Sequence, residues 1–266
     1  MSIRFGMPSL IETNHARECA ALCRDLGLDF IELNTNFPQY LPQKLDSKEL
    51  VEIAEEFGVS YTIHLDDNMN IADFNPYVAQ GYWKTMVETI GLAKQVKIPV
   101  LNMHMNRGAV YTLPDRKVYF FGGYRDHYLK YIEEFRKICE DAVGDSGIRI
   151  CIENTDGYTD FQQEAVERLL ESPVFGLTLD IGHFYCADNA DTRVYQKHET
   201  RLHHMHMHDA KDGKKDHLPL GKGVLDMKHF LNLANGHNAT VVLETKTAAG
   251  LTESVQWLRK NHPEYF

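Results

Sequence analysis

The chain has 266 residues, a formal net charge of −10 and a hydrophobic share of 43%, which allow one large domain or two small ones with a sizeable core. The acidic charge gives no general attraction to nucleic acid, and no apolar run is long enough to cross a membrane. Five cysteines without a CxxC pair, and an N-terminus without the charged start and apolar core of a signal peptide, predict a reduced, cytoplasmic protein.

Eight short apolar segments predict strands, and each is followed by a helical or loop segment. They are residues 3–7, 30–33, 61–65, 100–105, 148–153, 175–180, 203–209 and 240–245. Eight β/α units in about 250 residues is the size of a TIM barrel. A doubly wound open sheet also alternates strands and helices, but no glycine-rich GxGxxG turn follows the first strand here. We therefore predict an α/β fold, a single-domain (β/α)8 TIM barrel over residues 1–266.

The intervening segments carry recognisable helix boundaries. Residues 46–49 form a capping-box pattern, the pair 75–76 reads as N-cap and first helical proline, and residues 160–163 predict a further helix start. Residues 124–143 have apolar side chains at helical spacing. The longest stretch predicted to be irregular is 106–123, and loops of that length often act as lids or binding loops.

The run HHMHMHD at residues 203–209 alternates histidine with methionine over most of its length. Side chains alternate between the two faces of a strand, so His204, His206 and His208 are expected on one face. Whether that face holds a metal depends on what the neighbouring strands place beside it.

Six consecutive predicted strands carry a metal-type ligand at or near their carboxyl ends, which converge on one mouth in a TIM barrel. In chain order, the residues are His64, His104, Glu153, Asp180, His206 and Glu244. Any one of them alone is more simply read as a core or capping residue. Three carboxylates in one dry mouth need cations, however, because an unpaired buried charge costs several kcal/mol. Oxygen and nitrogen ligands without thiolates suit Zn²⁺ or Mn²⁺ best and also admit Fe²⁺, Co²⁺ or Mg²⁺.

The segments IHLDDNMNIA, LNMHMNRG, CIENTDG, LTLDIGH, HMHD, HLPLGKGVLD and VLET follow one another from the third strand to the eighth. In these segments the chain resembles the xylose isomerase-like TIM barrel superfamily. That superfamily includes sugar phosphate isomerase/epimerases and, more distantly, endonuclease IV-type AP endonucleases. The resemblance implies a principal metal on Glu153, Asp180, His206 and Glu244. His206 is selected because the family places its ligand three residues before the aspartate, here Asp209.

The resemblance implies further roles around the mouth. His64 and His104 match additional metal ligands of the endonuclease branch, and also pocket histidines of isomerase-like members. His183 and His217 match a third endonuclease metal site, but Lys215 stands where that branch has an aspartate. The residues expected in the substrate pocket are His183, His208, His217, Asp209 and Asn102.

The function that the resemblance implies is a metal-dependent isomerase or epimerase of a sugar or sugar phosphate. Glu153 and Glu244 would lie on opposite sides of the substrate, one taking a proton beside the carbonyl and the other returning it. Lys222 or Arg107 could meet a phosphate, although each is more simply read as a surface charge. Barrels of this kind often pair, which allows a homo-oligomer. The sugar, and the choice among isomerase, epimerase and dehydratase, stay open.

Two other functions stay open as well. An endonuclease IV-like multi-zinc phosphodiesterase acting on abasic DNA is supported by His64 and His104. Against it, the loop after the second strand has no basic residue before Lys44, and Asp66 and Asp67 after the third strand would repel phosphate. The remaining alternative is a barrel that binds a metal or sugar without catalysis, or a subunit of a larger enzyme.

Overall fold

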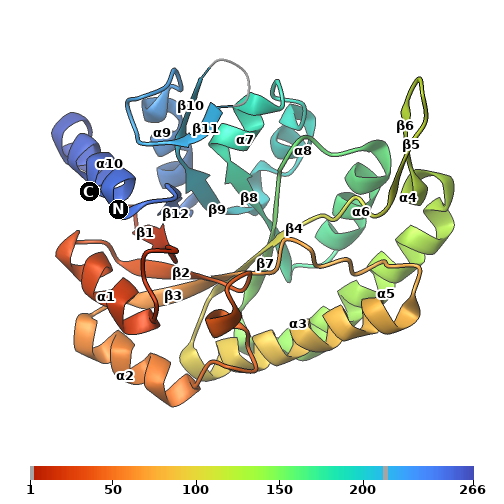
Figure 1. Ribbon diagram of the computed structural model, residues 1–266, viewed down its shortest axis with the longest axis horizontal. Coiled ribbons are helices and arrows are strands. Elements are labelled where there is room, and N and C mark those ends of the chain that lie inside the picture. The colour runs from red at the N-terminus through yellow and green to blue at the C-terminus, as the bar shows by residue number, and fades with distance from the viewer. Residues whose placement is uncertain (1–2, 212–214) are drawn as a thin grey trace.

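Eight parallel strands close into a barrel in the computed structural model, which describes residues 3–211 and 215–266 (Figure 1). The strands are β1 (Phe5–Pro8), β2 (Phe30–Asn34), β3 (Ser60–His64), β4 (Val100–His104), β7 (Arg149–Glu153), β8 (Phe175–Asp180), β9 (Leu202–Met207) and β12 (Thr240–Leu243). Pairing of β1 with β12 closes the ring. The predicted TIM barrel and its eight strands are confirmed, with small shifts at the strand ends.

Helices surround this barrel and connect its strands (Figure 1). The α-helices are α1 (Ala16–Asp25), α2 (Ser47–Phe57), α3 (Pro76–Val96), α4 (Phe120–Gly123), α5 (Arg125–Val143), α6 (Asp160–Leu170), α7 (Ile181–Cys186), α8 (Thr192–Lys197), α9 (Met227–His237) and α10 (Ala248–Asn261). Short 3₁₀ turns lie at Pro38–Tyr40, Gly144–Ser146, Glu199–Arg201 and Pro263–Tyr265. Within the described part of the chain, none of the helices combines the length and apolar character that a membrane crossing requires.

Side-chain caps define where these helices begin. Asp46 accepts a hydrogen bond from the backbone of Lys48 at the start of α2, and Asn75 caps α3 in the same way. The predicted start of α6 was wrong by one residue: the capping box consists of Thr159 and Gln162. Thr159 is extended and lies just outside the helix, so its side chain and that of Gln162 satisfy each other's backbone N–H.

Residues 106–123 contain two short strands and a helical turn, contrary to the prediction of an irregular stretch. β5 (Val110–Thr112) and β6 (Lys117–Tyr119) pair as an antiparallel hairpin, and α4 follows directly. The hairpin projects away from the barrel beside α4 (Figure 1). Its turn is closed by a backbone hydrogen bond from Leu113 to Arg116, and the rings of Tyr111 and Phe120 stack at 5.9 Å.

A second antiparallel pair lies where β9 leaves the barrel. It consists of β10 (Asp209–Lys211) and β11 (Lys215–Leu218). The predicted strand over 203–209 therefore ends at Met207, and Asp209 already belongs to the next element.

The barrel strands separate an apolar shell from a polar interior. Alternate residues such as Met103, Leu179, Met205 and Leu243 are buried in the hydrophobic core. Their neighbours along the strands are buried polar residues, which gather inside the barrel and at its carboxyl-terminal mouth. This alternation brings the chemically active side chains together.

Candidate active site

Four of the predicted ligands meet at the carboxyl ends of adjacent strands. Glu153 ends β7, Asp180 ends β8, His206 lies near the end of β9, and Glu244 directly follows β12. All four are buried, and one potential ligand atom of each lies within 4.8 Å of the others. We call these four residues the ligand ring.

His206 lies at the centre of the ligand ring. Its Nδ1 atom is 3.0 Å from Glu244 Oε2, 3.3 Å from Glu153 Oε1 and 3.9 Å from Asp180 Oδ2. Ligand atoms bonded to one divalent ion at about 2.0–2.2 Å are separated by roughly 3–4 Å. The spacing therefore suits one such ion.

In two of the carboxylates, Glu153 and Glu244, one oxygen contacts a neighbouring side chain and the other oxygen faces the centre of the ligand ring. Glu153 Oε2 accepts a hydrogen bond from the Asn102 amide and lies 3.1 Å from His104 Nε2. Glu244 Oε1 accepts from Lys246 Nζ at 2.6 Å, whereas Glu244 Oε2 has no hydrogen-bond partner among the described residues. An unpaired buried carboxylate oxygen beside an imidazole nitrogen is what a metal ligand requires before the metal binds.

The electrostatics of the ring demand a positive charge. Burial alone would lower the pKa of His206, but Glu153, Glu32 and Glu244 together raise it well above its usual value. Burial would raise the pKa values of Glu153 and Glu244, yet His206 and other cationic neighbours hold both well below their usual range. A divalent cation would supply the same positive charge once His206 has lost its extra proton. The donor set of three carboxylates and one imidazole thus fits Zn²⁺ or Mn²⁺.

His64 and His104 lie beside Glu153. His64 Nε2 is 3.4 Å from Glu153 Oε2, and the two imidazole rings are 4.9 Å apart. Burial would lower the pKa of His64, but Glu153 raises it to about 9. Asp67 completes a small group, with Oδ1 3.3 Å from His104 Nδ1. Both histidines therefore use their nitrogens to support Glu153 and the loop that follows β3.

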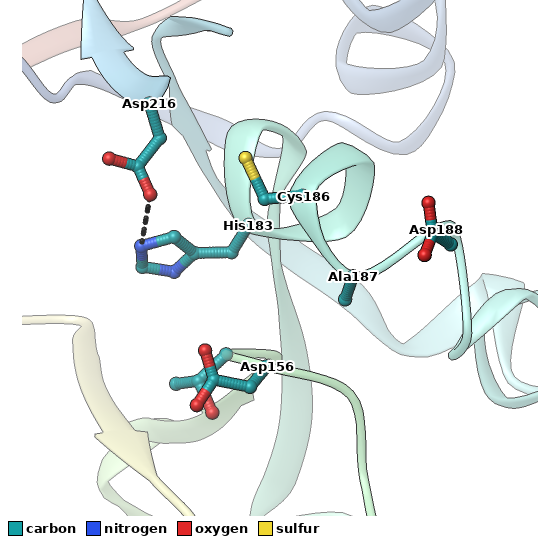
Figure 2. A pocket seen from close by; sticks show the side chains of 7 residues that line it. Asp156, His183, Cys186, Ala187, Asp188 and Asp216 are labelled. Atoms are coloured by element: carbon teal, nitrogen blue, oxygen red, sulfur yellow. Dashed lines mark ion pairs between the residues drawn. The ribbon is translucent and has the colours of Figure 1, made fainter. Parts of the chain in front are cut away.

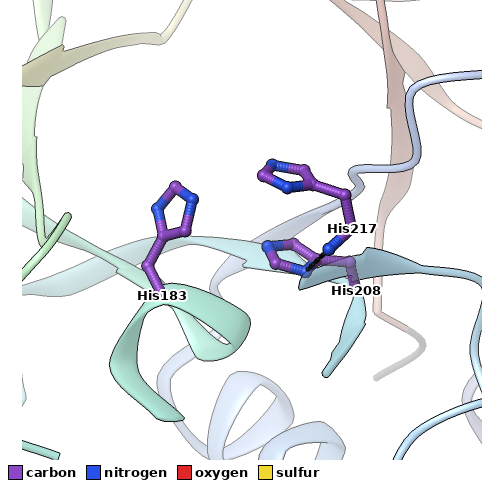
Figure 3. Close-up of side chains that lie close together, drawn as sticks. All are labelled: His183, His208 and His217. Atoms are coloured by element: carbon purple, nitrogen blue, oxygen red, sulfur yellow. Dashed lines mark hydrogen bonds between the residues drawn. The ribbon is translucent and has the colours of Figure 1, made fainter. Parts of the chain in front are cut away.

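Three further histidines gather on the other side of the mouth: His183, His208 and His217 (Figure 3). We call them the three-histidine cluster. His208 Nε2 lies 3.0 Å from both oxygens of Asp180, and His208 Nδ1 accepts the backbone N–H of His217 at 2.7 Å. Both nitrogens of His208 are thus occupied. The ring packs so closely over Gly182 that a Cβ added there would lie 1.9 Å from it.

A pocket of about 540 Å³ adjoins this cluster. His183 lies between Asp216 and Asp156 in its wall, with His183 Nε2 3.8 Å from Asp216 Oδ2 (Figure 2). Asp188 adds a third carboxylate to the lining. A pocket lined in this way favours a neutral or cationic group over a phosphate.

The two cations suggested for phosphate binding are engaged elsewhere. Lys222 Nζ lies 3.5 Å from Glu253 on the surface. Arg107 contacts Asp156 at 3.2 Å and donates to the backbone carbonyl of Gly157 at 2.6 Å.

Asp209 supports a loop. Its two carboxylate oxygens accept backbone N–H groups of Gly221, Gly223 and Leu225 at 2.8–3.2 Å. The residue is 1% exposed, and its oxygens face these donors. The GKG segment is therefore anchored under the mouth by the aspartate that was expected in the substrate pocket.

Sequence reasoning missed two charged residues of the site. Glu32, in β2, is 2% exposed and lies against His204 and His206. Lys246 follows Glu244 by two residues and donates to it. An acidic residue amid the apolar FIEL strand was the available signal for Glu32, and the KT dipeptide after VLET contained none for Lys246.

The fold and the ligand ring define a TIM barrel with a divalent-metal type of site at its mouth. Residues 20–261 match the model of the xylose isomerase-like TIM barrel family, and the chain belongs to that family. An uncharacterised protein of Methanocaldococcus jannaschii is 23% identical over 200 residues, which is 73% of each chain.

Solved structures share this architecture. A D-tagatose 3-epimerase-like protein superposes with a TM-score of 0.76 at 22% identity, over 99% of this chain and 98% of its own. The IolI protein with a bound zinc atom superposes with a TM-score of 0.74 at 15% identity, over 100% and 99%. At these identities the similarity establishes the fold.

Proposed function

We propose that the protein is a metal-dependent isomerase or epimerase of a sugar, acting by proton transfer at the carbon beside a carbonyl. The observation that carries the proposal is the pair of buried carboxylates, Glu153 and Glu244, each within 3.3 Å of His206 Nδ1. Each belongs to the ligand ring and is also close enough to its centre to exchange a proton with a molecule bound there.

The roles follow from these contacts. Glu153, Asp180, His206 and Glu244 would hold a divalent cation, which would supply the Lewis acid that makes the C–H beside the substrate carbonyl more acidic. Glu153 and Glu244 remove and return the proton from opposite sides. His104 supports Glu153, and Lys246 supports Glu244, so each carboxylate keeps its orientation while its proton changes.

The charges around the mouth favour a neutral sugar over a sugar phosphate. The adjoining pocket is lined by Asp156, Asp188 and Asp216, and Arg107 is already paired with Asp156. The similarity to a D-tagatose 3-epimerase-like protein supports a ketose as the substrate class.

The test is proton exchange on a panel of ketoses. Untagged protein loaded with Mn²⁺ or Zn²⁺ is incubated in D₂O with unphosphorylated ketohexoses and, in parallel, with ketose phosphates. Deuterium uptake is then followed by NMR. Uptake into an unphosphorylated ketose, lost in Glu244→Gln, supports the proposal. No uptake into any member of the panel by metal-loaded protein would contradict it.

A phosphodiesterase acting on abasic DNA is the second candidate, because His64 and Asp67 join His104 as a further group of metal-type ligands beside Glu153. The half-buried carboxylate of Asp66 and the exposed carboxylate of Asp67 beside that group oppose a DNA backbone. Cleavage of abasic duplex by zinc-loaded protein would favour this candidate. A cytoplasmic location and self-association remain predictions, as does the alternative of a non-catalytic barrel or enzyme subunit.

A further inference from the structure

Glu32 lies inside the barrel beneath the ligand ring. It occupies the middle of β2, in register with Thr62 of β3, and is 2% exposed. Its neighbours are two buried histidines of β9, His204 and His206, which are each 0% exposed. A carboxylate in so dry a place is stable only if donors surround it.

The donors around Glu32 are well defined. Glu32 Oε2 lies 3.0 Å from His204 Nε2 and accepts the Thr62 hydroxyl at 3.1 Å. An ionised Glu32 can only accept, so His204 Nε2 carries the proton given to it. His204 Nδ1 then accepts from the Thr240 hydroxyl at 2.6 Å. One oxygen of the carboxylate is thereby satisfied by His204 and Thr62.

The other oxygen of Glu32 faces His206. Glu32 Oε1 is 2.9 Å from His206 Nε2, an ion-pair contact in which the N–H does not point straight at the oxygen. Two lone pairs at that distance would repel each other, so His206 Nε2 must carry a proton. The neutral imidazole that binds a metal has a single N–H, and with Nε2 protonated its lone pair lies on Nδ1.

His206 Nδ1 is the atom that faces Glu153, Asp180 and Glu244. A lone pair directed at three carboxylates is unfavourable unless a cation lies between them. Glu32 therefore orients the His206 imidazole so that Nδ1 can bind a metal in the ligand ring. The same relation between carboxylate, histidine and metal is general in metal sites.

We propose that Glu32 is a positioning residue that holds the His206 proton on Nε2 and directs the Nδ1 lone pair into the ligand ring. The proposal rests on the metal centre of the proposed function. Glu32 contacts only the far side of His206, so it acts through that imidazole and not on the substrate. A shorter aspartate at this position would lose the contact.

The test compares four proteins: wild type, Glu32→Ala, Glu32→Gln and the control Thr240→Val. Zn²⁺ affinity is measured by competition with a chromophoric chelator. ¹⁵N-histidine NMR identifies which nitrogen of His206 carries the proton, with Zn²⁺ and without it. Thr240→Val changes the far end of the same buried chain but leaves the pair of Glu32 and His206 intact.

Glu32→Ala is expected to weaken Zn²⁺ binding about 10- to 100-fold, the usual effect of removing an outer partner of a metal-bound histidine. Glu32→Gln keeps an acceptor oxygen and should recover part of that loss. Thr240→Val should bind like wild type. Wild-type His206 should show an Nε2 proton in both states. In metal-free protein that proton should be retained in Glu32→Gln and lost in Glu32→Ala.

Two outcomes would overturn the proposal. One is wild-type Zn²⁺ affinity in both Glu32 variants. The other is a wild-type His206 whose Nε2 carries no proton. Failure of wild type to bind any divalent metal would instead count against the proposed function, and the comparison of the Nε2 proton between metal-free wild type and metal-free Glu32→Ala would still decide the role of Glu32. Because glutamine is nearly the same size as glutamate, Glu32→Gln remains informative if Glu32→Ala does not fold.

Discussion

The ligand ring and the three-histidine cluster lie on the same mouth, but they differ in the negative charge that they offer to a metal. In the ring, three buried carboxylates surround a single imidazole nitrogen, and Glu244 Oε2 has no hydrogen-bond partner among the described residues. In the cluster, His208 uses one nitrogen toward Asp180. Its other nitrogen accepts from the backbone of His217 (Figure 3). His183 Nδ1 and His217 Nε2 have no hydrogen-bond partner among the described residues.

We therefore expect the metal at the ring and not at the cluster, because the three carboxylates of the ring supply the negative charge that a divalent cation compensates. His183 of the cluster lines the pocket that contains Asp156 and Asp216, and its Nδ1 atom lies 3.6 Å from Asp180 Oδ2 of the ring. The predictions below test whether the ligand ring, and not the three-histidine cluster, binds the metal, and they run from the largest expected effect to the smallest.

Removing an imidazole should have very different effects in the two regions. His206→Ala takes the central nitrogen from the ligand ring, so Zn²⁺ affinity should fall by more than the 10- to 100-fold typical of outer partners. His183→Ala should change it by less than about threefold, since His183 is outside the ring. Isothermal titration of both variants checks this. Equal losses of Zn²⁺ affinity in the two variants would contradict the assignment of the metal to the ligand ring.

Glu244→Gln separates proton transfer from metal binding. The amide cannot carry the proton, so exchange between substrate and solvent should be abolished. Its oxygen can still approach a cation, so Zn²⁺ affinity should fall less than in His206→Ala. The surface variant Glu253→Gln is the matched control and should behave like wild type. Full exchange in Glu244→Gln would remove Glu244 from the proposed mechanism.

The metal-free protein should lose stability as the pH rises. The pKa of His64 is raised to about 9 in the folded chain, against about 6.5 when unfolded. Its stabilising contribution is therefore fully present below pH 6.5 and is lost as the pH passes through about 9. We expect Tm to fall by a few degrees over that range.

His64→Gln is the comparison for this pH effect and should flatten the profile, as measured by thermal unfolding from pH 6 to pH 10. A His64→Gln profile as steep as that of wild type would assign the effect to other groups.

His217→Ala should have the smallest effect. The hydrogen bond from His217 to His208 comes from the backbone and survives loss of the side chain. Zn²⁺ affinity and Tm should therefore stay close to wild type, while the KM for a substrate that reaches the pocket should rise a few-fold. A large drop in Zn²⁺ affinity would show that the cluster does hold metal.

Much of the fold could be predicted from the sequence because two periodic patterns indicate it. Strand alternation and the strand-helix rhythm located the barrel. The rule that strand ends converge then brought six candidate ligands together, and the resemblance to the family selected Glu153, Asp180, His206 and Glu244 among them. The hairpin within 106–123 was missed because two three-residue strands joined by a short turn leave too little pattern to recognise.

The remaining differences concern what each polar atom contacts. Nothing in the local sequence shows that Asp209 binds backbone N–H groups more than ten residues later, or that a backbone N–H from β11 occupies His208. Glu32 is separated from His204 by 172 residues and meets it only when the barrel closes. Such contacts depend on three-dimensional closure and not on periodicity.

The most direct test of the account is the divalent metal content per chain, measured by elemental analysis on untagged protein purified without chelator. The account predicts about one equivalent, lost in His206→Ala and retained in His183→Ala. Two or three equivalents, with one lost in His183→Ala, would contradict it and would direct the next experiment to abasic DNA.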